Sequence, residues 1–449
     1  MSTHLRILAL AVALAASARG ASAQQAAPTE FWSALGDTTL VRLVNETRHA
    51  SREIHIAGAR ASAARATRTG AALELLPVVT TRGSFTRQRL ASASFPGASG
   101  AFPDQSVWDA GLALSWEVDV SGRLRHSLRG RGALVDAAAE DVRDAEVVLT
   151  SQVAGAYLAL RGAQQRLAVA RRNAENQRRT LEVTERRLEA GRGTQLDTER
   201  AKAQLSATLA AIPTLESTIE TARQRIRVLT GRTQSEELTL PPCDTSVELP
   251  DPPALDATER TARAVLERPD VRSAERQHAA SAAFVGAARA EYLPKVSVGG
   301  GAGYTGTEMR ALGDAGTPRY VIGPVLSWPA FDLVRVRANV EVARADEMAS
   351  RARYELALSR AQEEAETSLF AYRKSRERLE HLEDAAAASA RAAELARLRY
   401  VEGGSDFLQV LDAERTLLER ENERAAGRTE AESNLIAIYR ALGGAAGFR

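Results

Sequence analysis

Residues 111–125 read GLALSWEVDVSGRLR, and residues 323–337 read GPVLSWPAFDLVRVR. Both stretches place Leu-Ser-Trp before an Asp and an Arg-x-Arg pair, and they lie 212 positions apart in a chain of 449 residues. The same offset aligns further pairs of like residues: Trp108 with Tyr320, Trp116 with Trp328, Gly191 with Gly403, and Leu196 with Leu408. A constant offset over this length indicates one long structural unit that has been duplicated.

Two segments in each unit alternate between apolar residues and polar or small ones. This period of two predicts four β-strands, which are residues 78–87, 108–118, 295–304 and 320–328. Each has roughly ten residues, the length that a tilted transmembrane strand requires. Aromatic residues near the strand ends are expected at the lipid interface, namely Trp108, Trp116, Tyr304, Tyr320 and Trp328. A soluble, half-buried hairpin in each unit is the alternative interpretation.

After each pair of strands, residues on one face recur every seven positions, which predicts long helices that pack as coiled coils. The first seam is Val153, Leu160, Leu167, Ala174, Leu181 and Leu188, and the second is Ala365, Tyr372, Leu379, Ala386, Ala393 and Tyr400. Residues 121–191 contain no proline, so we expect a helix of roughly 105 Å there. A glycine-containing turn then leads into a returning helix, with a kink expected at Pro213. Each unit therefore ends in a helical hairpin.

The composition limits the class of protein. Residues 1–23 have the pattern of a cleaved secretory signal, so the mature chain is expected to be exported. Without the signal, 57 basic residues balance 57 acidic ones, which argues against a nucleic-acid partner. The single cysteine, Cys243, excludes an intramolecular disulfide. No lipid anchor is expected, because the mature chain is predicted to start at Gln24, and no apolar window after residue 23 has the length of a spanning helix.

The repeat and the proline pattern predict the organisation of the chain. We expect a first repeat over residues 24–231, built from a helix, two strands, a long helix and a helical hairpin. A proline-rich linker follows over 232–255, then the second repeat over 256–444 and a short tail over 445–449.

Four strands cannot close a barrel, and open strand edges in lipid leave unpaired backbone groups that cost several kcal/mol each. The chain is therefore expected to form oligomers. Eight strands from a dimer would give a barrel filled by side chains, whereas twelve from a trimer leave a lumen. Small or polar residues on the second strand face, such as Ser115 and Gly299, favour the open lumen.

Several separate motifs resemble the TolC-like outer-membrane factor family, in particular its branch associated with RND efflux pumps. They are ERPDVRSAERQHAASAAFVGAARAEYLPKVSV (267–298), GPVLSWPAFD (323–332), RLRYVEGGSDFLQVLDAERTLLERE (397–421) and YRALGG (439–444). The resemblance covers essentially the whole mature chain. It departs in one respect, because most members of that branch carry a lipidated cysteine where this chain has Gln24.

The resemblance implies an α+β membrane protein in the outer membrane of a Gram-negative bacterium. Three chains would form a twelve-stranded transmembrane β-barrel that continues into an α-helical coiled-coil periplasmic tunnel, with the linker and both chain ends in an equatorial belt. It also implies an efflux channel that passively exports small molecules such as drugs, together with a periplasmic adaptor protein and an inner-membrane pump. An outer-membrane duct for type I protein secretion is the alternative within this class.

The resemblance places a gate at the turn of the second hairpin. Leu408 and Asp412 are four residues apart and would lie on one helix face. By resemblance they match the apolar and acidic rings that close the periplasmic mouth, and Tyr400 matches a tyrosine that ties neighbouring helices in the closed state. Asp406 is expected either to add a second acidic ring or to cap the helix. The alternative places Leu408 in the coiled-coil core and makes Asp412 either a solvated charge or a partner of the dipole at the helix N-terminus.

The two hairpin tips are the expected docking surface for the adaptor. In both tips an arginine precedes a glycine by four residues. The candidate residues are Arg187, Gly191, Gly193, Thr194, Arg399, Gly403, Gly404 and Ser405. A structural role would also account for the glycines, since a tight turn between helices needs a positive φ.

Other classes of protein find less support. The six histidines show no ligand spacing with cysteine or acidic residues, so neither a metal, a cofactor nor an enzyme activity is expected. A soluble periplasmic coiled-coil scaffold is the rival from another class, but it does not account for the aromatic strand ends.

Overall fold

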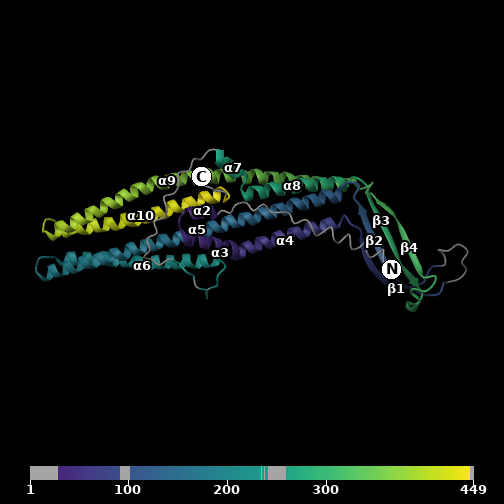
Figure 1. The fold of residues 1–449 in the computed structure, drawn as a ribbon, viewed down its shortest axis with the longest axis horizontal. Helices are drawn as coiled ribbons and strands as arrows, with labels where there is room; N and C mark the ends of the chain where they lie inside the picture. The colour runs from purple at the N-terminus through teal and green to yellow at the C-terminus, as the bar shows by residue number, and fades with distance from the viewer. Residues whose placement is uncertain (1–28, 92–101, 234, 237, 241–258, 445–449) are drawn as a thin grey trace.

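The computed structural model describes residues 29–91, 102–233, 235–236, 238–240 and 259–444. The predicted signal, Cys243, most of the predicted linker and the tail lie outside these residues. The described chain is a long rod, with a small sheet at one end and two helical hairpins at the other (Figure 1).

The order of elements repeats along the chain. The first series is α2 (Thr29–Ala34), α3 (Thr38–Ala50), α4 (Arg52–Leu73), β1 (Val78–Gln88), β2 (Gln105–Val118), α5 (Arg123–Glu189) and α6 (Gln195–Leu229). The second is α7 (Glu259–Leu266), α8 (Pro269–Ala290), β3 (Lys295–Gly306), the short 3₁₀ helix η2 (Met309–Ala311), β4 (Pro318–Ser327), α9 (Leu333–Val401) and α10 (Phe407–Ala441). The predicted strands and hairpins are confirmed, whereas α2, α3 and α7 were not anticipated from the sequence; the exact boundaries of the two repeats stay a prediction.

The four strands form one antiparallel sheet in the order β1-β2-β3-β4. Its two faces differ, as the alternation predicted. On one face the rings of Phe85 and Trp108 pack with centroids 4.5 Å apart. On the other face Arg319 Nε donates to Asp109 Oδ2 at 2.6 Å, across β3, whose residue Gly303 is the strand partner of Arg319. The sheet therefore has an apolar face and a polar face, and β1 and β4 each keep one edge without a strand partner among the described residues.

Strand β3 is rich in glycine because the neighbouring backbone approaches it closely. A Cβ added to Gly303 would lie 2.3 Å from the carbonyl oxygen of Ala110. The side chain of Arg319 lies over this part of the strand, and its Nη1 would be 3.8 Å from a Cβ at Gly301. Gly303 thus permits the close approach of β2, and the Arg319 side chain passes at van der Waals distance from Gly301.

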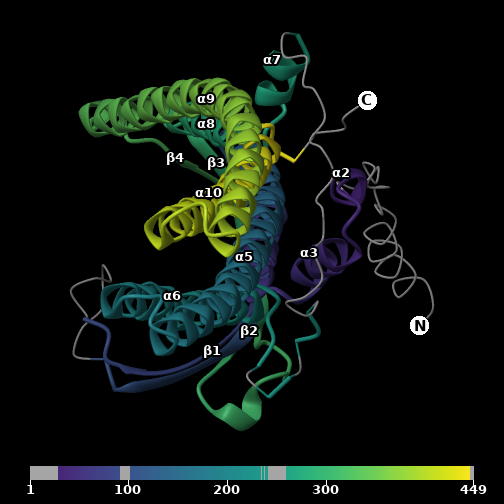
Figure 2. The same ribbon diagram turned by 90° about the vertical axis from the view of Figure 1, so that its left-hand side faces the viewer.

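Long helices connect the sheet to the hairpins. Helix α5 has 67 residues, a length of about 100 Å, and α6 continues through Pro213. The first predicted seam is buried at Val153, Leu160, Leu167 and Ala174. The prediction is wrong for Leu188, which is 36% exposed, because α5 ends one residue later, at the tip. Figure 2 shows the α5–α6 and α9–α10 hairpins side by side, with α5 against α10.

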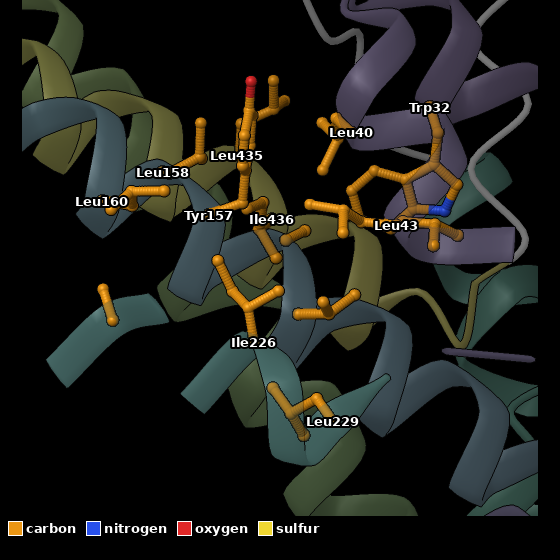
Figure 3. Packing of buried hydrophobic residues seen from close by; sticks show 14 of the residues in the cluster. Trp32, Leu40, Leu43, Tyr157, Leu158, Leu160, Ile226, Leu229, Leu435 and Ile436 are labelled. Atoms are coloured by element: carbon orange, nitrogen blue, oxygen red, sulfur yellow. The ribbon is translucent and has the colours of Figure 1, made fainter. Parts of the chain in front are cut away.

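The main hydrophobic core lies midway along the rod, between the sheet and the hairpin tips, where α2 and α3 pack on α5 and α10. Figure 3 shows Trp32, Leu40 and Leu43 of the N-terminal helices turned toward Tyr157, Leu160 and Ile436. The ring of Trp32 lies 4.5 Å from that of Tyr439, centroid to centroid. The core therefore joins residues from the two ends of the described chain.

A buried hydrogen bond fixes α3 in this core. Asp37 caps α3 by accepting from the backbone N–H groups of Thr39 and Leu40. Its second carboxylate oxygen accepts a hydrogen bond of 2.7 Å from the hydroxyl of Tyr157 on α5. Burial of this hydroxyl raises its pKa, so Tyr157 stays a hydrogen-bond donor. Asp37 thus anchors the N-terminal helices to the long helix.

Glu432 on α10 is a carboxylate with little access to water. Its side chain is 14% exposed, and Arg428 lies 3.6 Å away. Burial raises the pKa of Glu432 to about 7, against the lowering effect of Arg428. In the unfolded chain the group ionises near its ordinary value of 4.5, so the unfolded state loses this proton at a lower pH than the folded state. The free energy of unfolding therefore falls as the pH rises from about 4.5 to about 7.

We expect Glu432→Gln to raise the unfolding temperature at pH 8 and to leave it nearly unchanged at pH 4.5. The amide has no charge to desolvate, and the gain at pH 8 is about 3 kcal/mol at most. Thermal unfolding in detergent, followed by circular dichroism at the two pH values, measures the difference. An equal shift at both would show that packing, not ionisation, controls this site.

Candidate functional site

The two hairpin tips share one turn geometry. In the first, Gly191 has φ +67° and the N–H of Arg192 donates to the carbonyl of Arg187 at 2.8 Å. In the second, Gly403 has φ +79° and the N–H of Gly404 donates to the carbonyl of Arg399 at 2.8 Å. Both bonds close the helix end with a left-handed glycine. The glycine of each tip therefore has a structural cause, whereas these bonds use only the backbone of the arginine.

Each returning helix begins with a side-chain cap. Thr194 Oγ1 accepts from the N–H of Asp197 at 3.2 Å in the first tip. Asp406 Oδ1 accepts from the N–H of Leu408 at 2.5 Å in the second. Of the two roles expected for Asp406, the structure supports the capping role.

Leu408 and Asp412 lie together on the exposed face of α10. Leu408 is 46% exposed, and the coiled-coil core beside it is formed by Phe407 and Val410 instead. Asp412 is also exposed, and its carboxylate lies 3.0 Å from Arg415. In a single chain, the alternative that placed Leu408 in the core does not hold, so the pair is free to face other chains or solvent.

Tyr400 connects the two hairpins of one chain. The guanidinium carbon of Arg187 lies 3.9 Å from the centre of the Tyr400 ring, within the range of a cation–π contact. The same guanidinium donates from Nη2 to the carbonyl of Tyr400 at 3.1 Å. On its other side Tyr400 packs against Phe407, with centroids 5.6 Å apart. Arg187, predicted as a docking residue, is therefore engaged within the chain.

The remaining predicted docking residues lie on the surface of the tips. Gly191, Thr194, Arg399, Gly403 and Gly404 are exposed, and Gly193 and Ser405 are half-buried. The tips thus offer backbone, small side chains and the side chain of Arg399 on their surface.

Sequence reasoning missed Glu414, a charged residue at a core position. It is 4% exposed, and its Oε1 accepts from Arg397 Nε on α9 at 2.8 Å and from Thr180 Oγ1 on α5 at 3.1 Å. Glu414 follows Phe407 by seven and Val410 by four residues, and this core spacing was the signal that could have revealed it. The carboxylate of Glu414 therefore joins α5, α9 and α10, on the side of Leu408 and Asp412 that faces away from the tip.

Metal clusters and membrane-spanning helices are absent from the part of the chain that the structure describes. Within the described ranges, no group of three His, Cys, Asp or Glu side chains is arranged to hold a metal ion. No helix of the described chain combines the length and apolar character needed to cross a membrane.

Comparison with known proteins identifies the family. The model of the family described as outer membrane efflux protein matches residues 43–232 and 262–444. The probable efflux pump outer membrane protein SepC of Pseudomonas putida is 30% identical over 380 residues, which cover 82% of this chain and 76% of that protein. Outer membrane protein OprJ of Pseudomonas aeruginosa is 31% identical over 347 residues, covering 76% and 70%.

Solved structures of outer-membrane channels have the same fold as this chain. The outer-membrane channel OprN is 38% identical, with a TM-score of 0.83 over 93% of this chain and 92% of that one. The channel CusC is 24% identical, with a TM-score of 0.84 over 94% and 95%, and shares the fold. The chain therefore belongs to the outer membrane efflux protein family and has the α+β fold of a TolC-like outer-membrane channel.

Proposed function

We propose that three copies of the chain form a closed twelve-stranded barrel and an α-helical tunnel, the outer-membrane duct of a tripartite efflux system. The observation that carries this proposal is the sheet, which has an apolar face, a polar face and two open edges. Pairing β4 of one chain with β1 of the next satisfies the edges without exposing backbone to lipid. The polar face then lines the lumen.

The names of relatives support small molecules as the exported class. The toluene efflux pump outer membrane protein TtgF of Pseudomonas putida is 30% identical to this chain, and the pyoverdine export outer membrane protein OpmQ of the same species is 28% identical. Both names describe export of small compounds, which favours this class over the protein-secretion alternative. A periplasmic adaptor at the hairpin tips and an inner-membrane RND pump would supply the substrate and the energy.

We propose that Leu408 and Asp412 narrow the lower mouth of the tunnel. Three-fold symmetry would turn each exposed side chain into a ring, one apolar and one acidic. The bond between Arg187 and Tyr400 would hold the second hairpin against the first while this mouth is closed.

Leu408→Ala combined with Asp412→Ala is expected to convert small, flickering openings into large, steady ones, because both rings are removed. Single-channel conductance in planar lipid bilayers measures this. The matched control is Leu196→Ala with Arg200→Ala, which changes the repeat-equivalent positions of the first hairpin. If the wild type already shows large, steady openings and the double substitution does not change them, Leu408 and Asp412 do not form the gate.

Arg187→Ala is expected to raise the fraction of time that the channel is open. The substitution removes the cation–π contact and one hydrogen bond between the hairpins, about 1 kcal/mol or a factor of about five per chain. The same bilayer recordings measure open probability. Arg399→Ala is the control, since Arg399 is the repeat-equivalent arginine and is exposed. If both variants open equally, a general loss of positive charge at the tips is responsible.

A further inference from the structure

A basic cavity lies between α8 and α9 just below the sheet. Its volume is about 350 Å³, and it is lined by Arg289, Tyr292, Arg337, Val340, Glu341 and Arg344. Three arginines against one glutamate give the lining a net charge of +2. The parts of α8 and α9 that line it lie far from both hairpin tips, near the sheet end of the rod (Figure 1).

Only one of the three arginines has a carboxylate partner among the described residues. Arg337 Nε lies 2.9 Å from Glu341 Oε1 on the next turn of α9. Within the described ranges, no ion pair involves the exposed side chains of Arg289 or Arg344. Two guanidinium groups thus converge on one cavity without a described partner of opposite charge.

One residue of the cavity lining contacts the apolar face of the sheet. Trp328 directly follows β4 and belongs to the apolar face by alternation. Its indole Nε1 donates to the carbonyl of Tyr292, a residue that lines the cavity, at 3.0 Å. The tryptophan marks the level at which the membrane interface meets the helices. The cavity therefore lies directly below that interface.

The depth of the upper part of the cavity matches a layer of lipid headgroups. Arg337 is four residues beyond the start of α9 and Arg344 eleven, roughly 6 and 17 Å along the helix. Headgroups extend roughly 5–8 Å beyond the hydrocarbon core on each side. Arg337 therefore lies within the headgroup layer, as does Arg289, one residue before the end of α8, whereas Arg344 lies deeper and closes the far end of the cavity.

We propose that this cavity binds the phosphate headgroup of an anionic phospholipid in the periplasmic leaflet of the outer membrane. Guanidinium groups bind phosphate oxygens through paired, charge-assisted hydrogen bonds, and basic pockets at membrane interfaces recognise anionic headgroups. Arg289 and Arg344 provide the charge, Arg337 is shared with Glu341, and Tyr292 packs against the glycerol region. The proposal rests on the membrane placement of the sheet and adds a lipid site to the duct.

The test is native mass spectrometry of the purified, delipidated full chain, titrated with phosphatidylglycerol, with phosphatidylcholine or with inorganic phosphate. The variant is Arg289→Gln with Arg344→Gln. Its matched control is Arg373→Gln with Arg391→Gln, two exposed arginines of α9 that lie about 60 Å or more beyond the helix start. The oligomeric mass in the same spectra tests the three-chain assembly separately from lipid binding.

We expect phosphatidylglycerol to bind the wild type and the control variant equally, and the Arg289/Arg344 variant on the order of tenfold more weakly. Phosphatidylcholine should bind weakly to all three proteins. Equal binding of phosphatidylglycerol to wild type and variant would overturn the proposal. So would inorganic phosphate that displaces phosphatidylglycerol at equal concentration, because the site would then recognise a free anion and not a lipid.

Discussion

The hydrogen bonds of the strand backbones constrain this molecule more than any other interaction. In lipid, every N–H and C=O group of a strand needs a partner within the protein, and the four strands of one chain leave the outer edges of β1 and β4 without one among the described residues. The backbone groups of these two edges find partners when the sheet pairs with the sheets of other copies of the chain. The helices continue directly from the strands. Closure of the sheet into a barrel therefore also fixes the position of each helical hairpin around the barrel axis.

Below the sheet, the character of the helix contacts changes along the rod. At mid-height α5 and α10 meet through apolar residues such as Leu160 and Leu435. Nearer the tips polar contacts are added: Arg166 donates to Asn422 at 2.7 Å, Asn173 to Glu421 at 3.0 Å, and Thr180 to Glu414. The apolar contacts are fewer there and are made by Leu181 with the small cluster of Ala201, Phe407 and Val410. Hydrogen bonds between polar side chains can be exchanged for water at little net cost, whereas separating apolar surfaces exposes them. The upper contacts therefore resist separation more than the lower ones.

The sequence predicted the strands to within a few residues, because a period of two beside glycine-rich turns fits a strand and does not fit a helix. It predicted the long helices through their seven-residue spacing, although the seam failed at Leu188, where α5 comes to its end. Short helices such as α2 and α3 were not predicted, because they contain few apolar residues, and these are buried only through contacts with α5 and α10. At the tips, composition identified the turn glycines but not the contact between Arg187 and Tyr400, which joins residues 213 positions apart. Glu414 was missed because a carboxylate at a core position is favourable only with partners from two other helices.

The packing of Trp32 on Tyr439 has a consequence for how the protein is made. These two rings are separated by almost the whole length of the chain, so the core midway along the rod cannot be completed until α10 has crossed the inner membrane. Contacts of such long range form slowly, and apolar surface stays exposed in the meantime. Helix α3 can dock on α5 earlier, since the bond of Tyr157 to Asp37 lies within the first half of the chain, but the rings of α2 that pack on Tyr439 stay exposed until α10 arrives, and in this interval the chain is most prone to aggregation.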